Sequence, residues 1–347
     1  MSPTRRRVIA GALATPLVGR AHAAGGNITF GAYSGIFEEN YRAAVVEPFM
    51  RAHPDITLTY YALGNSAQTL GLLRTQKAAP QMDVVMFDVS VAKAASDEGL
   101  LAPIDDLKVL ADLSPRAFTK GVTGAANTFD NFVLLYAPQK VQPAPTSWKV
   151  LWDEKYADQI AIPAAPDIVG ISMTLMANKV FGGTDYRTTV EPGLAALEKL
   201  APSVLSWNPM PDPYSFIINA TAALGVGWNA RGQLYAGQSE GRLAVAIPDE
   251  GSLFQINTLA LVKGAKNPDA ARIWIEYALG AEAQKTFTER MFYAPVNIKA
   301  AISPAAMART AATPERLSRM LDIDWLEVAK IRDGITEQWR RRILTRR

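Results

Sequence analysis

No cysteine occurs anywhere in the 347 residues. Its absence excludes disulfides, thiolate metal sites and a lipid-modified N-terminal cysteine. Histidine is scarce as well, because only His22 and His53 occur. His53 directly precedes Pro54 at an apparent helix end, where a solvated helix-terminal role is expected. A Ser-His-Asp hydrolase or a histidine-based metal site therefore has almost no residues from which to be built.

The motifs of several enzyme classes are also missing. No phosphate-binding loop of the Gly-x-x-x-x-Gly-Lys type appears, and the segment GISMT (residues 170–174) lacks the second glycine of a nucleophile elbow. Two carboxylates acting as an acid and base pair remain an alternative, although no local pattern points to such a pair. We therefore expect no enzyme activity, no catalytic residue, no metal and no cofactor.

The first 23 residues have the pattern of a secretory signal. Arg5, Arg6 and Arg7 precede a short, mildly apolar stretch that ends in Ala21-His22-Ala23, a small-x-small cleavage pattern. The basic cluster favours export by the twin-arginine route, with a mature chain that begins near Ala24. No later segment contains the roughly 20 consecutive apolar residues needed to span a bilayer. These features predict a periplasmic protein.

Removal of this signal changes the balance of charge. The signal contains four arginines and no acidic residue, so the 36 basic residues of the whole chain fall to 32, against 33 acidic ones. Five of the remaining basic residues are arginines at the extreme C-terminus, which leaves an acidic body. An acidic body argues against nucleic acid as a partner and favours a cationic ligand.

Short runs rich in β-branched and aromatic residues alternate with helical patterns along the mature chain. Phe37, Tyr41, Val45 and Phe49 recur at four-residue spacing, which is typical of one helix face. Alternating strands and helices predict α/β layering with mainly parallel sheets, which bind ligands at the carboxyl ends of their strands. We expect strands at residues 28–33, 56–61, 83–87, 132–136, 160–163, 224–228, 243–247 and 258–262.

The mature length exceeds what one hydrophobic core usually holds, and no long linker divides it. Five segments occur in a recognisable order, namely MDVVMFD (82–88), TSWKVLWDEKYADQIAIP (146–163), LGVGWNA (224–230), PDEGSLFQINTLALVKGAKNPDAARIWIEYAL (248–279) and FYAPVN (292–297). In this order they resemble the extracellular solute-binding proteins of family 1, the periplasmic binding proteins of ABC importers. Within that family the chain is most similar to the spermidine/putrescine-binding branch.

The resemblance implies the type II periplasmic binding protein fold. In this fold two α/β lobes, each with a mainly parallel sheet flanked by helices, are joined by crossing hinge strands around a ligand cleft. We expect residues 24–130 with 256–300 to form one lobe, and residues 131–255 with 301–347 to form the other. The resemblance also implies a monomer that delivers a small solute to an ABC permease in the inner membrane.

The family pattern also implies which residues contact the solute. Aromatic faces attract an ammonium group, and carboxylates fix it through charge-assisted hydrogen bonds. Ordinary structural roles compete for some of these positions: core packing for Trp228, a helix N-cap for Asp88 and a tight turn for Glu250. The expected ligand-binding residues are Tyr33, Ser34, Phe87, Asp88, Asp167, Trp228, Glu250, Gln255, Asn257 and Tyr293.

Two departures from the polyamine-binding pattern predict a different solute. That branch carries a Trp and, two residues later, an Asp after the Pro-Glu-Gly block, whereas this chain has Gln255 and Asn257. These two residues alternate along a strand and are expected to face the same side. Losing one aromatic ring and one charge predicts a monoamine or amino-acid-like solute, bound more tightly than spermidine.

Other functions on the same fold remain open. They include binding of an aminophosphonate, a thiamine-like cation or ferric ion, a sensory receptor, and a periplasmic enzyme. For ferric ion, the tandem Tyr60-Tyr61 lies in an alternating strand, where the two side chains are expected to diverge.

Overall fold

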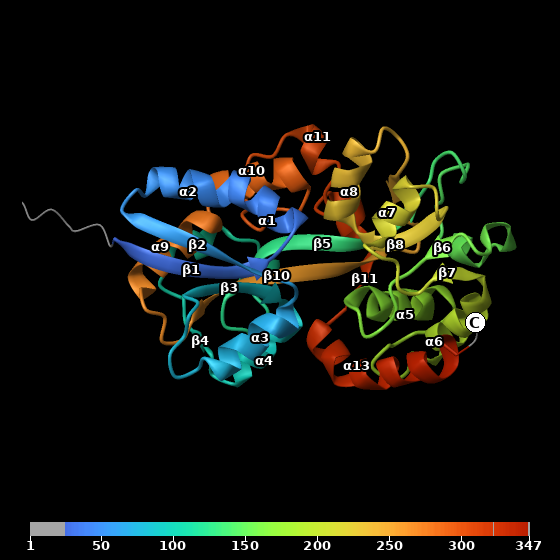
Figure 1. Cartoon of the computed structure of the whole chain (residues 1–347), viewed down its shortest axis with the longest axis horizontal. Coiled ribbons are helices and arrows are strands. Elements are labelled where there is room, and N and C mark those ends of the chain that lie inside the picture. The colour runs from blue at the N-terminus through green and yellow to red at the C-terminus, as the bar shows by residue number, and fades with distance from the viewer. Residues whose placement is uncertain (1–24, 322, 346–347) are drawn as a thin grey trace, which may run out of the picture.

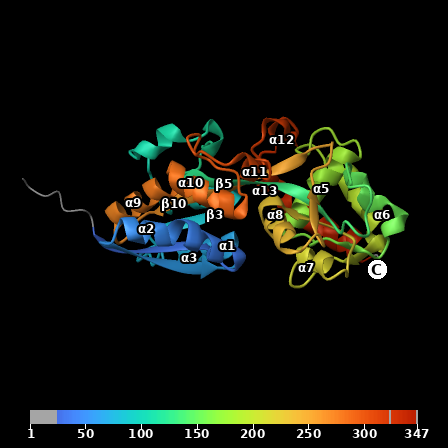
Figure 2. The same ribbon diagram turned by 90° about the horizontal axis from the view of Figure 1, so that it is seen from above.

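The computed structural model describes residues 25–321 and 323–345, so the expected signal at residues 1–23 lies outside the described part of the chain. Two lobes lie side by side along the longest axis of the molecule (Figures 1 and 2). Strands β5 (Ala125–Tyr136) and β10 (Ser252–Val262) run from one lobe into the other. None of the described helices is long and apolar enough to cross a membrane.

The strands form one mixed sheet, in the order β2 (Ile56–Leu63), β1 (Gly26–Tyr33), β3 (Val84–Asp88), β10, β5, β8 (Leu224–Trp228), β6 (Ile160–Ala161) and β7 (Val204–Ser206). Strands β1, β2 and β3 are parallel in the first lobe, as are β6, β7 and β8 in the second. The crossing strands are antiparallel to each other, β10 is antiparallel to β3, and β5 is antiparallel to β8. Of the other strands, β4 (Leu101–Ala102) and β11 (Met320–Leu321) pair with β10, and β9 (Ala244–Ala246) pairs with β5. The expected α/β architecture with crossing strands is thereby confirmed.

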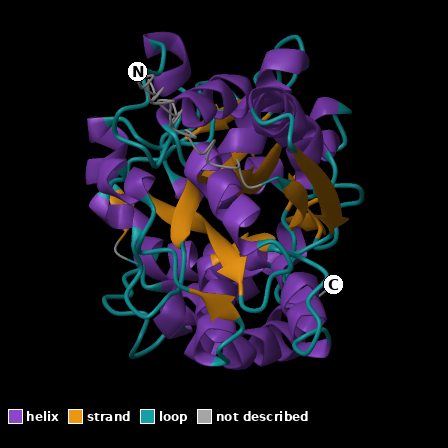
Figure 3. Ribbon diagram, turned by 90° about the vertical axis from the view of Figure 1, so that its left-hand side faces the viewer, coloured by secondary structure: helices purple, strands orange, loops and turns teal. Residues whose placement is uncertain are grey.

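Helices surround the sheet, as the view along the long axis shows (Figure 3). The predicted apolar face at Phe37, Tyr41, Val45 and Phe49 is buried, and α1, a π-helical turn (Arg42–Val46) and α2 carry it. The α-helices are α1 (Ile36–Tyr41), α2 (Glu47–Ala52), α3 (Ser66–Thr75), α4 (Val89–Asp97), α5 (Ile168–Val180), α6 (Glu191–Leu200), α7 (Pro213–Ile218), α8 (Asn229–Gln238), α9 (Pro268–Ala278), α10 (Ala281–Met291), α11 (Pro304–Met307), α12 (Pro314–Ser318) and α13 (Trp325–Gln338).

Each lobe has its own hydrophobic core, and the crossing strands contribute to both. Ala126 and Phe129 of β5 pack in the core of the first lobe, whereas Phe132 and Leu134 pack in the core of the second. Ile256 of β10 packs against both cores. The strands therefore pass through the junction without a flexible linker. The lobe boundaries at residues 130/131 and 255/256 stay a prediction.

Candidate functional site

A cavity of about 400 Å³ lies where the two lobes meet. Its walls come from the carboxyl ends of β1, β3 and β8, the first turns of α3, α5, α7 and α8, and the middle of β10. The ends of parallel strands are the expected position for a ligand site in an open α/β sheet. Eight of the ten expected binding residues line it: Tyr33, Ser34, Asp88, Asp167, Trp228, Gln255, Asn257 and Tyr293.

Asp88 is the carboxylate at the centre of the first-lobe wall. It occupies the N-cap position of α4, but its side chain makes no capping hydrogen bond. Instead, Oδ2 accepts a hydrogen bond from Ser66 Oγ at 2.8 Å, and Oδ1 accepts one from Gln255 Nε2 at 3.1 Å. Burial raises the pKa of Asp88 above the ordinary carboxyl value. The carboxylate is thus held by neutral donors, and no positively charged side chain of the described residues is in contact with it.

Asn257 and Gln255 lie on the same side of β10, as the alternation predicts. Asn257 Oδ1 accepts a hydrogen bond from the Tyr33 hydroxyl at 3.0 Å, and Asn257 Nδ2 donates to Thr128 Oγ1 at 2.9 Å. Burial, reinforced by the charge of Asp88, raises the pKa of Tyr33 well above its ordinary value. Tyr33 therefore remains a neutral hydrogen-bond donor, and the two amides hold Tyr33 and Asp88 in place.

Trp228 lies in the second-lobe wall and is fixed by Tyr214. The Tyr214 hydroxyl accepts a hydrogen bond from Trp228 N at 2.7 Å and lies 3.1 Å from Trp228 O, to which it donates. Close approach of this hydroxyl requires a glycine, because a Cβ at Gly227 would lie 2.4 Å from it. The indole ring also packs edge-on against Phe132, with ring centroids 5.5 Å apart. Trp228 is therefore held rigidly while part of its surface faces the cavity.

Tyr293 faces the cavity from the segment that follows α10. Its ring stacks on Phe287, with centroids 5.5 Å apart and an interplanar angle of 13°, and meets Phe37 edge-on. Burial raises the pKa of Tyr293, with a further contribution from Asp130. A neutral tyrosine on a packed aromatic cluster provides a rigid surface for a solute.

Arg231 is the cation of the cavity, and the sequence reasoning missed it. It lies on the first turn of α8, three residues after Trp228. Within the described part of the chain its guanidinium has no hydrogen bond or salt bridge, and its Cζ lies 5.9 Å from the centre of the Tyr214 ring. The position of Arg231 could have been predicted from the sequence, since the first helical turn after a strand lies at the edge of the sheet where ligands bind.

Two further carboxylates line the cavity but already have structural roles. Asp167 caps α5 by accepting a hydrogen bond from Val169 N at 2.7 Å, and Asp212 caps α7 by accepting one from Ser215 N at 2.7 Å. Asp212 was also missed by the sequence reasoning. Both carboxylates keep free lone pairs, so they add negative charge near the solute.

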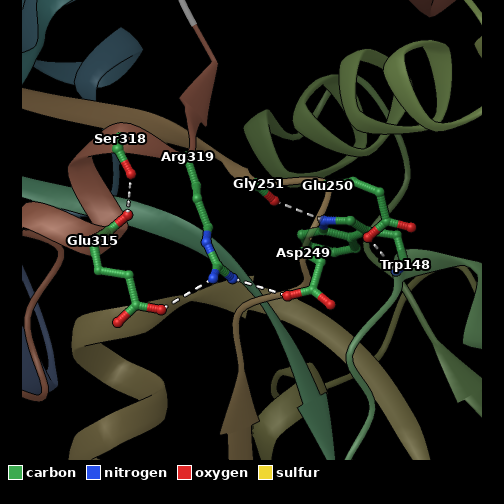
Figure 4. Close-up of polar contacts among 7 residues, drawn as sticks. All are labelled: Trp148, Asp249, Glu250, Gly251, Glu315, Ser318 and Arg319. Atoms are coloured by element: carbon green, nitrogen blue, oxygen red, sulfur yellow. Dashed lines mark hydrogen bonds and ion pairs between the residues drawn. The ribbon is translucent and has the colours of Figure 1, made fainter.

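The structure places Phe87 and Glu250 away from the cavity. Phe87 is fully buried in the core between β3, α3 and α4. Glu250 accepts hydrogen bonds from the Ser147 hydroxyl and, at 3.3 Å, from Trp148 N (Figure 4). It therefore anchors the Trp148 segment to the start of β10, which is the local structural role weighed for it from the sequence.

Glu250 lies within a tight turn of residues 248–251, which a hydrogen bond from Gly251 N to Pro248 O closes at 3.0 Å. On the other side of this turn, Asp249 pairs with Arg319 at 2.9 Å, and Trp148 Nε1 donates to Gly251 O at 2.9 Å (Figure 4). Gly251 has a φ of 98°, which favours glycine.

Metal-binding groups do not converge on the cavity. Among the described residues, no group of three or more His, Cys, Asp or Glu is placed to hold a metal ion. The tyrosines of the tandem pair diverge, since Tyr60 is buried and donates to Tyr33 O at 2.6 Å whereas Tyr61 is exposed. Neither tyrosine lines the cavity.

Several known proteins with similar sequences are named as solute-binding proteins. The family model described as bacterial extracellular solute-binding protein matches residues 44–315. The γ-aminobutyric acid-binding protein of Pseudomonas aeruginosa is 24% identical over 286 residues, which cover 80% of this chain and 79% of that protein. Spermidine/putrescine-binding periplasmic protein 1 of Haemophilus influenzae is 26% identical over 242 residues, which cover 66% and 65% of the two chains.

Solved structures show the same fold. The spermidine/putrescine ABC transporter substrate-binding protein of Streptococcus pneumoniae superposes with a TM-score of 0.73 at 16% identity, covering 91% of this chain and 98% of that one. The two-lobed arrangement described above is the arrangement of such proteins. The chain therefore belongs to the bacterial extracellular solute-binding proteins.

Proposed function

We propose that the cavity binds a small zwitterionic solute that carries one amine and one carboxylate, such as γ-aminobutyrate. The observation that carries this proposal is the placement of Asp88 and Arg231 in one cavity. Asp88 comes from β3 in the first lobe, and Arg231 comes from α8 in the second. Neither charge is neutralised by an ion pair with a described residue, so each is available to an opposite charge of the solute.

Closure of the lobes follows from the same arrangement. The amine binds Asp88 in one lobe and the carboxylate binds Arg231 in the other, so one solute joins both lobes. A ligand stabilises the closed form only by its extra contacts in that form. A solute with charge at one end only loses one of these contacts and is expected to bind more weakly.

The aromatic residues add to recognition of the amine. Tyr33, Trp228 and Tyr293 all line the cavity. An ammonium over such a ring gains about 0.5–2 kcal/mol, depending on its desolvation. The relative that is named for γ-aminobutyric acid supports the choice of an amino-acid-like solute.

Spermidine is the second candidate. Three carboxylates, those of Asp88, Asp167 and Asp212, line the cavity beside one arginine, and this excess of negative charge favours a polycation. The relatives named for spermidine and putrescine support the same candidate. Against it, Asp167 and Asp212 cap helices, and the unpaired guanidinium of Arg231 repels a second ammonium.

The test uses four solutes with the same four-carbon chain: γ-aminobutyrate, putrescine, butylamine and butyrate. Titration calorimetry on the mature protein is expected to show the tightest binding for γ-aminobutyrate, by at least about tenfold over each of the others. This margin corresponds to about 1.4 kcal/mol, the low end of the energy of one charged hydrogen bond. Spermidine is included as the second candidate.

Matched variants separate the two ends of the solute. Arg231→Gln is expected to abolish the preference for γ-aminobutyrate over butylamine, and Asp88→Asn the preference over butyrate. Arg340→Gln is the control, because Arg340 is an exposed arginine on the surface of the second lobe. Tighter binding of putrescine or spermidine than of γ-aminobutyrate, or an Arg231→Gln variant with unchanged preference, would overturn the zwitterion assignment.

We further propose that the protein works in the periplasm as a monomer and delivers its solute to an ABC permease. The relatives named as periplasmic proteins support the location. Transport assays with a reconstituted permease separate delivery from a sensory role, because a sensor binds the solute without supporting its uptake.

A further inference from the structure

Asp130 is a buried carboxylate at the junction of the two lobes. It lies on the crossing strand β5 opposite Gln255 of β10, and only 1% of its surface is exposed. The next backbone bridge along β5 joins Phe129 to Ala294, the residue after Tyr293. Asp130 therefore lies between the cavity residues of the first lobe and those of the second.

The hydrogen bonds of Asp130 tie it to the helix that carries Arg231. Oδ1 accepts from Asn131 N at 2.8 Å and from Ala230 N at 3.0 Å, and Oδ2 lies 3.3 Å from Ala230 N. Ala230 is in the first turn of α8, whose own N-cap residue makes no side-chain capping hydrogen bond. Asp130 of strand β5 thus caps α8 through the backbone N–H of Ala230, the residue that directly precedes Arg231.

The charged and titratable groups around Asp130 come from three elements. Arg231 of α8 stabilises its charge, although the two do not form an ion pair within 4.0 Å. The negative charge of Asp130 contributes to the raised pKa of Tyr214 in α7 and of Tyr293 after α10. Strand β10 contributes the uncharged Gln255.

We propose that Asp130 is the positioning residue for Arg231 and that it takes up a proton when a solute carboxylate binds to that arginine. This inference rests on the proposed function, because it needs a solute with a carboxylate. A carboxylate on Arg231 brings a second negative charge close to Asp130 in a buried site, and the repulsion is relieved by protonation of Asp130. Burial has already raised the pKa of Asp130 to about 7, so the proton is gained at near-neutral pH.

The direction of the pH effect distinguishes Asp130 from Asp88. If the complex holds more protons than the free protein, affinity rises as the pH falls, by up to tenfold per pH unit for about one proton. Protonation of Asp88 has the opposite effect, because it removes the charge that attracts the amine. Affinity that rises from pH 8.5 to pH 7 is therefore the signature of Asp130.

The experiment is calorimetric titration of the mature protein with γ-aminobutyrate, in buffers of low and high ionisation enthalpy, between pH 6.5 and pH 8.5. The wild type is expected to take up a fraction of a proton at pH 7.5 and to bind several-fold more tightly at pH 7 than at pH 8.5. Asp130→Asn keeps an acceptor for the α8 backbone and is expected to take up no proton. Asp130→Ala lacks the acceptor and is expected to bind more weakly at every pH, whereas Asp130→Asn restores much of this loss.

The outcomes separate this inference from the solute assignment. Proton uptake that persists in Asp130→Asn, or its absence in a wild type that binds γ-aminobutyrate, overturns the role of Asp130 and leaves the zwitterion assignment intact. If γ-aminobutyrate does not bind, the zwitterion assignment fails, and titration of the Asp130 carboxyl by carbon NMR in the solute-free protein tests whether Asp130 exchanges a proton near neutral pH. Its signal is identified by its loss in Asp130→Asn. A midpoint below pH 5 overturns the proton-binding role of Asp130, and a midpoint near pH 7 supports that role.

Discussion

Replacing Gly227 by alanine is expected to displace the tyrosine that holds Trp228 in the cavity wall. The new Cβ would lie 2.4 Å from the Tyr214 hydroxyl oxygen and 2.7 Å from Cζ, roughly 1 Å closer than an ordinary contact. Tyr214 is buried, so it cannot move freely. Overpacking costs about 1–3 kcal/mol, and loss of the hydrogen bond from Trp228 N adds about 1–2 kcal/mol. We therefore expect a loss of about 2–5 kcal/mol in the free energy of unfolding.

A double-mutant cycle with Tyr214→Phe tests this reasoning. Tyr214→Phe alone loses the hydrogen bonds to Trp228 and is expected to cost about 1–2 kcal/mol. The double variant no longer has the atom nearest to the new Cβ, so its cost is expected to fall short of the sum of the single costs by about 1 kcal/mol or more. Urea unfolding gives these values, with Gly334→Ala as the control, because nothing lies within 4 Å of that helical position. Additive costs, or a Gly227→Ala variant within about 0.5 kcal/mol of the wild type, would refute the proposed contact.

Three further predictions concern charge and backbone geometry. Asn257→Asp restores the second carboxylate of the polyamine pattern and is expected to raise spermidine affinity relative to γ-aminobutyrate about tenfold; unchanged affinity in calorimetry would show that this residue does not face the amine. Gly251→Ala is expected to cost about 3 kcal/mol or more in urea unfolding, because φ is 98° and its Cβ would lie 2.1 Å from Arg319 O. Gly241→Ala, with a φ of 79° and no atom within 4 Å, is expected to cost only about 1–2 kcal/mol. The Asp130 carboxyl has a pKa of about 7 in the folded protein against an ordinary 3.8. The free energy of unfolding is therefore expected to fall by up to about 1.4 kcal/mol per pH unit as the pH rises from about 4 to 7. Urea unfolding of Asp130→Asn is expected to lack this slope.

The sequence predicted the strands best where apolar residues dominate. Residues 224–228 were predicted as a strand and form β8 with the same bounds. The crossing strands were predicted only in part, because β5 begins at Ala125 and β10 at Ser252, several residues before the predicted starts. The junction half of β5 contains Asn127, Asp130 and Asn131, which weaken an apolar pattern. These side chains are nevertheless buried, since both lobes cover the strands at the junction.

Strand geometry explains why Phe87 and Asp88 were not both available to the cavity. Adjacent residues of a strand face opposite sides. Asp88 lines the cavity, so Phe87 points into the core. The same rule correctly placed Gln255 and Asn257 together. Arg231 was not predicted, because its side chain reaches the cavity from the first turn of a helix and not from the end of a strand.

The hydrogen-bond capacity of Asp88 gives a physical reason for the proposed preference for a single amine. A carboxylate offers about four lone pairs. At Asp88 they already accept hydrogen bonds from Ser66 Oγ and Gln255 Nε2, and the Tyr33 hydroxyl, whose proton is donated to Asn257, lies 3.4 Å from Oδ1. Gln255 stands where the polyamine pattern has a tryptophan. A tryptophan ring would add an aromatic face for an ammonium group, whereas Gln255 donates a hydrogen bond to Asp88 and so uses one of its acceptor sites. The remaining acceptor sites of the Asp88 carboxylate suit one ammonium group. Removal of this carboxylate is therefore expected to weaken the binding of monoamines and diamines to the same low level.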